Sequence, residues 1–165
     1  NIINYYDDNL DLRSKDPVDR FIHFHENIGL SNVLYGLMKT DVLHKTNLFG
    51  NYQGADIILI GELSLYGKFH EIPEYLFSRR FHSKASSSDK SLENQQLFFD
   101  PKTVGKLSFV YIKHPSQYIK AIHRSPININ DKMRLYRYIF RDVIRNRGNI
   151  YAELKNNIKY MHQKF

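Results

Sequence analysis

The chain has 165 residues, of which 42% are hydrophobic and 14% aromatic, and this composition excludes a disordered polypeptide. It has no cysteine and no run near the roughly 18 apolar residues of a membrane span, which predicts a cytoplasmic protein without disulfides or thiolate metal sites. The net charge of +7 is concentrated in residues 113–165, where 12 basic residues accompany 3 acidic ones, and this favours an acidic partner.

The amino-terminal part predicts a helix, a strand and a second, short helix. Asp16 can cap a helix whose first turn contains Pro17, and Gly29 is expected to end it. Residues 33–38 are typical of a short buried strand, and a brief helix is expected to begin at residues 40–41.

The central part predicts a buried helix followed by extended chain. Residues 56–66 are apolar on nearly every side, which indicates a helix enclosed by the core, and Gly67 is a suitable stop. Residues 69–72 and 75–81 are typical of strands, and the polar residues 83–90 of a loop.

The carboxyl-terminal part predicts a short helix over residues 115–123 and a long amphipathic helix from residue 130. Gly148 and Asn149 are expected to kink or split the long helix. A single stripe at spacings of three and four is expected to face the core: Met133, Tyr136, Phe140, Val143, Ile150, Leu154, Ile158 and Met161.

Asp56 and Glu62 are the acidic residues of the central helix. Asp56 is suited to the first turn, where a carboxylate caps the helix or interacts with its dipole, and this contributes about 0.5–2 kcal/mol. The functional interpretation is a general base whose pKa is set by burial and neighbouring charge. Glu62 is not on the Asp56 face, which favours a partnership with a nearby basic residue.

A basic cluster follows in the predicted strand. Arg80 and His82 would point to one side of a strand and Arg79 to the other. The cluster is either a solvated edge that discourages strand pairing or an anion site, in which guanidinium groups bind phosphate oxygens in bidentate fashion. The remaining histidines have no metal-ligand spacing.

The long carboxyl-terminal helix also has a basic ridge, formed by Arg134, Arg137, Arg141 and Arg145. Three interpretations stay open: an ordinary solvated face, adhesion to anionic lipid headgroups, and nucleic-acid binding aided by tyrosine stacking. The absence of any nucleic-acid-binding signature argues against the last.

Taken together, these motifs resemble the carboxyl-terminal, acceptor-side half of family 2 glycosyltransferases. The similarity covers residues 17–145. Its motifs are an aspartate-led helix ending in Leu-x-x-x-Gly, a strand ending in Arg-Arg-x-His with small hydroxyl residues after it, an upstream strand and turn, and a downstream Phe-Phe-Asp-Pro; here they fall at residues 55–67, 76–82, 86–87, 35–40 and 98–101.

The resemblance implies an inverting sugar transfer from a nucleotide-diphospho-sugar donor to an acceptor hydroxyl. Asp56 would be the catalytic base, and Tyr35, Gly36 and Glu62 would lie on the acceptor side. The donor diphosphate would be bound by Arg79, Arg80 and His82, with His82 also near a divalent metal, Mn²⁺ or Mg²⁺. Ala55 departs from the family, which usually has an acid before the catalytic aspartate.

The resemblance also implies the fold and the partners. It predicts a mixed, helix-rich α/β fold, the carboxyl-terminal part of a GT-A domain, with residues 1–112 as the acceptor-side half and 113–165 as a basic helical extension. We expect such a fragment to be inactive alone, to self-associate through exposed edges, and to contact the inner face of a membrane peripherally. One alternative is a non-catalytic basic module that binds anionic membrane or nucleic acid through the carboxyl-terminal helix. Another, suggested by Ala55 and the missing amino half, is a degenerate transferase domain without activity.

Overall fold

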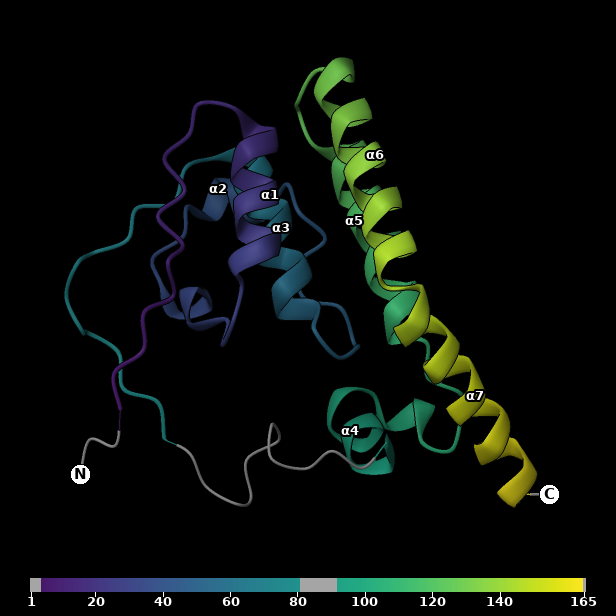
Figure 1. Ribbon diagram of the computed structural model, residues 1–165. Helices are drawn as coiled ribbons and strands as arrows, with labels where there is room; N and C mark the ends of the chain where they lie inside the picture. Colours follow the sequence, from purple (N-terminus) through teal and green to yellow (C-terminus); the bar gives the residue numbers. More distant parts are fainter. Residues whose placement is uncertain (1–3, 81–91, 165) are drawn as a thin grey trace.

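The computed structural model describes residues 4–80 and 92–164, and every regular element in these two ranges is helical. Figure 1 shows α1 and α3 side by side, the α5–α6 pair alongside them, and α7 extending beyond. The α-helices are α1 Pro17–Asn27, α2 Thr40–Leu43, α3 Ala55–Tyr66, α4 Leu92–Phe99, α5 Val110–Arg124, α6 Ile129–Arg145 and α7 Arg147–Lys164; the 3₁₀ helices are η1 Asn32–Tyr35 and η2 Pro101–Thr103.

The predicted mixed α/β fold of the GT-A type is therefore wrong for the described part of the chain. Residues 33–38 form no strand, because Ser31 adopts a left-handed conformation with φ 56° and η1 begins directly after it. The segment 68–80 is extended but belongs to no sheet. Phe81, the end of one predicted strand, lies outside the described residues.

The first part of the extended segment, residues 69–75, runs antiparallel to residues 5–12. One backbone bond joins them, from the Phe69 amide to the Leu12 carbonyl at 3.0 Å. Further along, side chains make the contacts: the Leu10 amide donates to the Glu71 carboxylate at 2.9 Å, and the Tyr75 hydroxyl donates to Asp7 at 2.9 Å. A β-sheet requires successive hydrogen bonds between the two backbones. Because only one is present here, the two segments are extended but form no sheet.

Helix α1 begins as predicted. The Asp16 side chain accepts a hydrogen bond from the Val18 amide at 2.8 Å, and Pro17 takes the first helical position. The helix ends at Asn27, two residues before the predicted stop. Its inner face, with the fully buried Phe21 and Phe24, packs on α3.

Helix α3 is the centre of the core, and its predicted burial and its end at Gly67 are confirmed. Nine of its twelve residues are buried, and the Gly67 amide donates to the Leu63 carbonyl. Gly61 permits the close packing, since a Cβ there would lie 2.7 Å from a ring carbon of Tyr118. One apolar cluster joins α3 to α1, α5 and α6, and a second joins it to α1 and the segments around η1 and α2.

Arg20 links α1 to the carboxyl end of α3. Its Nε donates to the Ser64 carbonyl at 2.8 Å, and its Nη1 donates to the Ser14 carbonyl at 2.9 Å. The residue is only 6% exposed, and burial lowers the pKa of its guanidinium although the charge of Asp16 raises it. Arg20 thus satisfies carbonyls that the helix end leaves unpaired.

We expect Arg20→Lys to lower the free energy of unfolding by about 2 kcal/mol, because one ammonium cannot reach carbonyls on both sides of the planar guanidinium. Urea unfolding followed by circular dichroism would measure this. Arg13→Lys is the control, because Arg13 is exposed and should change stability by less than about 0.5 kcal/mol. Equal stabilities of the two variants would contradict the role of Arg20.

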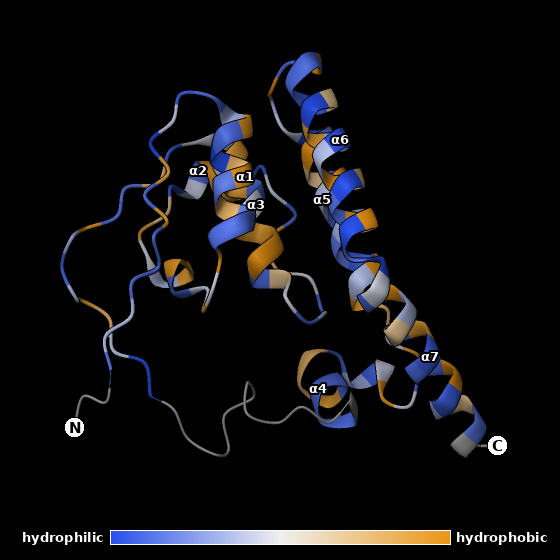
Figure 2. Ribbon diagram, in the orientation of Figure 1, coloured by the Kyte–Doolittle hydropathy of each residue, from blue (hydrophilic) through white to orange (hydrophobic). Residues whose placement is uncertain are grey.

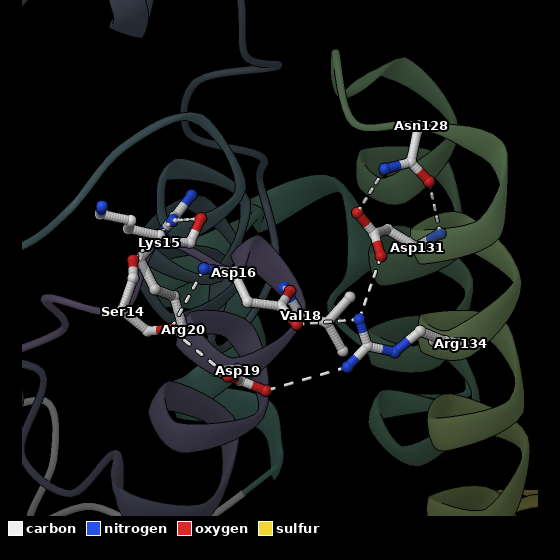
Figure 3. A network of polar contacts seen from close by, with 9 residues as sticks. All are labelled: Ser14, Lys15, Asp16, Val18, Asp19, Arg20, Asn128, Asp131 and Arg134. Carbon is white, nitrogen blue, oxygen red and sulfur yellow. Dashed lines mark hydrogen bonds and ion pairs between the residues drawn. The ribbon is translucent and has the colours of Figure 1, made fainter.

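Polar contacts join the start of α1 to α6. Arg134 donates to the Asp16 carboxylate at 2.8 Å and to the Asp131 carboxylate at 3.0 Å, and its Nη2 lies 3.9 Å from Asp19 (Figure 3). Asn128 caps α6 by accepting from the Asp131 amide. This network fixes the α5–α6 pair against α1.

The carboxyl-terminal helices differ in register from the prediction. Helix α6 buries Leu135 and Ile139, and Tyr136 and Val143 of the predicted stripe pack against the same cluster. Met133 and Phe140 of that stripe are 44% and 65% exposed, so the stripe is confirmed only in part.

The predicted long helix is divided, but the break lies at Asn146, and Gly148 and Asn149, where the split was predicted, lie within α7. Helix α5 includes the predicted domain boundary at 112/113, and that division stays a prediction.

Candidate functional site

Asp56 lies in the first turn of α3 and is half-buried. Ile60 and Leu63, four and seven residues further on, share its side of the helix. Both belong to the apolar cluster against which Val33 and Leu34 of η1 pack. The spacing therefore places Asp56 on the side of α3 that carries this cluster. Burial and, to a smaller extent, the charge of Asp56 raise the pKa of the Tyr118 phenol, so the carboxylate also lies within electrostatic range of α5.

Residues 77–79 of the extended segment contact η1 and the residues just before it. The Tyr35 ring stacks on the Phe77 ring, with 4.7 Å between centroids and 15° between planes. Two residues on, Arg79 donates to the Leu30 carbonyl at 2.8 Å, just before η1. Gly36 closes η1, its amide bonded to the Val33 carbonyl. Tyr35 and Gly36 thus lie at the end of η1, and Arg79 bonds to the chain just before its start.

The other predicted residues of the diphosphate site are less constrained. Arg80 is exposed on the extended segment, one residue beyond Arg79. His82, predicted to approach the diphosphate and the metal, lies outside the described residues. Diphosphate binding by Arg79, Arg80 and His82 stays a prediction.

Glu62 is a buried carboxylate held by one arginine. It is 1% exposed, and Nη2 of Arg124 lies 2.9 Å from its Oε1 and 3.0 Å from its Oε2. The predicted partnership with a basic residue is confirmed. Burial, followed by the Glu62 charge, raises the pKa of the Tyr52 and Tyr66 phenols. The acceptor-side role of Glu62 stays a prediction.

Asp8 is a residue of this region that the sequence did not assign. Burial raises the pKa of its carboxyl, and a hydrogen bond with Asn32 of η1 opposes that shift. Its Oδ1 is buried without a hydrogen-bond partner among the described residues. No sequence signal links Asp8 to η1, because the contact depends on how the amino-terminal segment folds back.

A hollow of about 270 Å³ lies on the other side of the core, between α1, α3, α5 and α6, and its polar lining includes His25, His114, Tyr118, Asp142 and Asn146. The His25 ring lies 3.0 Å from the Tyr138 hydroxyl and 3.9 Å from an Asp142 oxygen. Burial lowers the pKa of His25, although the Asp142 charge raises it, and burial raises the pKa of Tyr138 to about 12. Asp56 does not line this hollow.

The environment of His25 predicts a pH dependence of stability. Its pKa is lowered in the folded chain, so the unfolded chain takes up a proton first, near pH 6.5. The contribution of neutral His25 to the free energy of unfolding is therefore fully present above that pH. It is lost as the pH decreases from there through the pKa of the folded chain. We expect the free energy of unfolding to fall between pH 7.5 and pH 5.

Urea titrations at several pH values would test this with two variants. His25→Gln should flatten the pH dependence between neutral and mildly acidic pH, whereas His44→Asn, at an exposed position, should keep it. Asp11 and Asp16, whose carboxyl pKa values are lowered, act only at more acidic pH. An unchanged slope in His25→Gln would contradict the assignment.

Metal binding finds no support in the described geometry. Residues 4–80 and 92–164 contain no group of three histidine, aspartate or glutamate side chains that could hold an ion. Over the same residues, no helix combines the length and the apolar character needed to cross a bilayer.

Comparison with known proteins finds no family model that matches this chain, no similar curated protein and no similar solved structure. The resemblance to family 2 glycosyltransferases therefore rests on the motifs alone, and we carry it forward only as a proposal about the site.

Proposed function

We propose that this chain is the acceptor-side part of an inverting glycosyltransferase, with Asp56 as general base. The observation that supports this most is the position of η1, which contacts both the α3 cluster and the segment with Arg79. The side of α3 with Asp56 packs toward η1, and the same short helix holds Tyr35 and lies beside the backbone to which Arg79 donates. This arrangement supports a site that combines an acid and a cation 23 positions apart in sequence.

The proposed chemistry follows from this arrangement. The Asp56 carboxylate would take the proton of an acceptor hydroxyl, whose oxygen then attacks the anomeric carbon of the sugar. The bond from that carbon to the donor diphosphate breaks, and the diphosphate leaves with the electron pair. Arg79 and Arg80 would stabilise its negative charge by charge-assisted hydrogen bonds.

The proposal concerns the site and not the sheet that the resemblance implied. The described residues do not fit a divalent metal, so no step is assigned to one. The donor, a nucleotide-diphospho-sugar, and the acceptor alcohol are the partners implied.

Donor turnover by the natural gene product is the direct test. It would be incubated with uridine, guanosine and thymidine diphospho-sugars, with and without alcohol acceptors, and the release of nucleoside diphosphate would be measured. We expect release that depends on an acceptor. A folded protein that releases no nucleoside diphosphate from any of these donors would contradict the proposal.

A further inference from the structure

Helix α6 has two apolar faces, and only one of them is used in the core. Leu135 and Ile139 are 0% and 2% exposed and pack with α1 and α5. A second set lies on the solvent side, with exposed fractions of 44–67%; we call it the outer stripe, and it consists of Ile129, Met133, Phe140 and Ile144. Figure 2 shows hydrophobic bands recurring along α6 and α7 at the edge of the molecule.

The outer stripe is bordered by the predicted arginine ridge. Arg134 is held by Asp16 and Asp131, and Arg145 by Asp142. Arg137 and Arg141 are exposed and form no ion pair with any described residue. Arg137 lies four residues after Met133 and three before Phe140, and Arg141 lies four residues before Arg145 and three before Ile144. Residues at these spacings are neighbours on a helix surface. Two cations without counter-charges therefore accompany the exposed apolar residues.

We propose that this face of α6 docks on an anionic lipid surface. Helices that lie in the membrane interface combine apolar side chains at the acyl boundary with basic residues near the headgroups. The outer stripe spans 16 residues, or about 24 Å of helix, which is enough to lie along such a surface. The exposed Tyr151 and Ile158 continue the apolar contact onto α7.

The charges favour lipid over the other possible occupants. A second copy of the chain would bring arginine ridges together on two molecules that each have a net charge of +7. A nucleic-acid backbone would neutralise Arg137 and Arg141 but leave Ile129, Met133 and Ile144 in water. An anionic lipid surface can neutralise the arginines and also bury the apolar side chains. This inference does not depend on sugar transfer.

Sedimentation with vesicles tests the proposal in the full chain. We expect binding to vesicles of equal parts phosphatidylcholine and phosphatidylglycerol at low salt, and little binding to phosphatidylcholine alone. The double variant Arg137→Gln/Arg141→Gln should reduce the partition coefficient roughly 10- to 30-fold, at about 1 kcal/mol for each basic residue. Phe140→Ser should also weaken binding, through the lost apolar contact.

The matched control removes the same charge elsewhere. Lys39 and Lys45 are exposed near α2, on the opposite side of α1 from α6 (Figure 1). Lys39→Gln/Lys45→Gln should retain most of the binding, and circular dichroism should show every variant folded. An equal loss in both double variants would overturn the proposal, since net charge alone would explain it.

Three further results would overturn it. One is no preference for anionic vesicles. Another is binding of a short RNA duplex that Arg137→Gln/Arg141→Gln abolishes while vesicles are not bound. The third is a dimer in light scattering that Phe140→Ser dissociates, again without vesicle binding, which would assign the outer stripe to a second copy.

Discussion

Replacing Arg124 with methionine is expected to lower the free energy of unfolding by about 3 kcal/mol or more. The reason is the carboxylate left behind. Glu62 is 1% exposed, and both of its oxygens accept from Nη2 of Arg124. Its other protein contact is weak, since the Asn47 amide lies 3.5 Å away. Without Arg124, the Glu62 carboxylate either stays charged and unpaired in the core or takes up a proton. Either result destabilises the fold.

A double-mutant cycle separates the pair from the packing of the arginine stem. Glu62→Met/Arg124→Met should recover much of the lost stability, because no charge is then buried. Arg141→Met, at an exposed arginine without an ion pair among the described residues, should change stability by less than about 0.5 kcal/mol. Urea unfolding of the unmodified protein, Glu62→Met, Arg124→Met and the double variant gives the four values of the cycle. A loss below about 1 kcal/mol in Arg124→Met would show that water, not Arg124, compensates Glu62.

The helices that were predicted well are those whose signals are local. Asp16 and Pro17 define the start of α1, and Gly67 the end of α3, through contacts within a few residues. The apolar run of α3 predicts burial whichever neighbour covers it. Such features need no knowledge of the rest of the chain.

The predicted strands failed because a strand depends on a distant partner. Residues 69–72 and 75–80 have the composition of strands and are extended, but residues 69–75 lie beside the segment 5–12, and Phe77 and Arg79 beside η1. There, side-chain contacts from Glu71 and Tyr75 replace successive backbone pairs. Composition predicts an extended backbone, but it does not predict which segment would pair with that backbone in a sheet.

The face that α6 buries was also decided by tertiary contacts. Apolar residues lie on both sides of this helix, so the stripe through Met133 and Phe140 and the one through Leu135 and Ile139 both fit a helical period. Packing against Phe21 and Tyr118 selected Leu135 and Ile139. The part of the prediction that failed is informative, because it leaves the other face available for a partner.

The sequence predicted the individual residues of the candidate site but not how they are arranged in space. The order of the motifs predicted an acid and cations on neighbouring elements. It could not show that η1 lies between the cluster on α3 and the Arg79 segment, since η1 replaced a predicted strand. Likewise the chemistry of Glu62 predicted a basic partner, whereas Arg124, 62 positions further on, became known only from the fold.

The largest effect on activity is expected from Asp56→Asn in the natural gene product. The amide has the shape of the carboxylate but cannot accept a proton, so the rate of sugar transfer should fall by roughly 10²- to 10⁴-fold. The loss should appear in kcat more than in KM, because the proton moves only in the transition state. Stability should change by about 1 kcal/mol or less, the contribution of one first-turn charge to the helix dipole.

Asp41→Asn distinguishes this role from a general effect of first-turn charge. Asp41 occupies the first turn of α2, as Asp56 does that of α3, but it is exposed. Both variants remove one negative charge from a helix start, so any shared loss of activity would come from folding or net charge. A base requires that only Asp56→Asn loses turnover while it unfolds at nearly the same urea concentration as the unmodified protein. If Asp56→Asn retained full turnover, Asp56 would only complement the dipole of α3, whose cap position is Gly54, and η1 would organise packing alone.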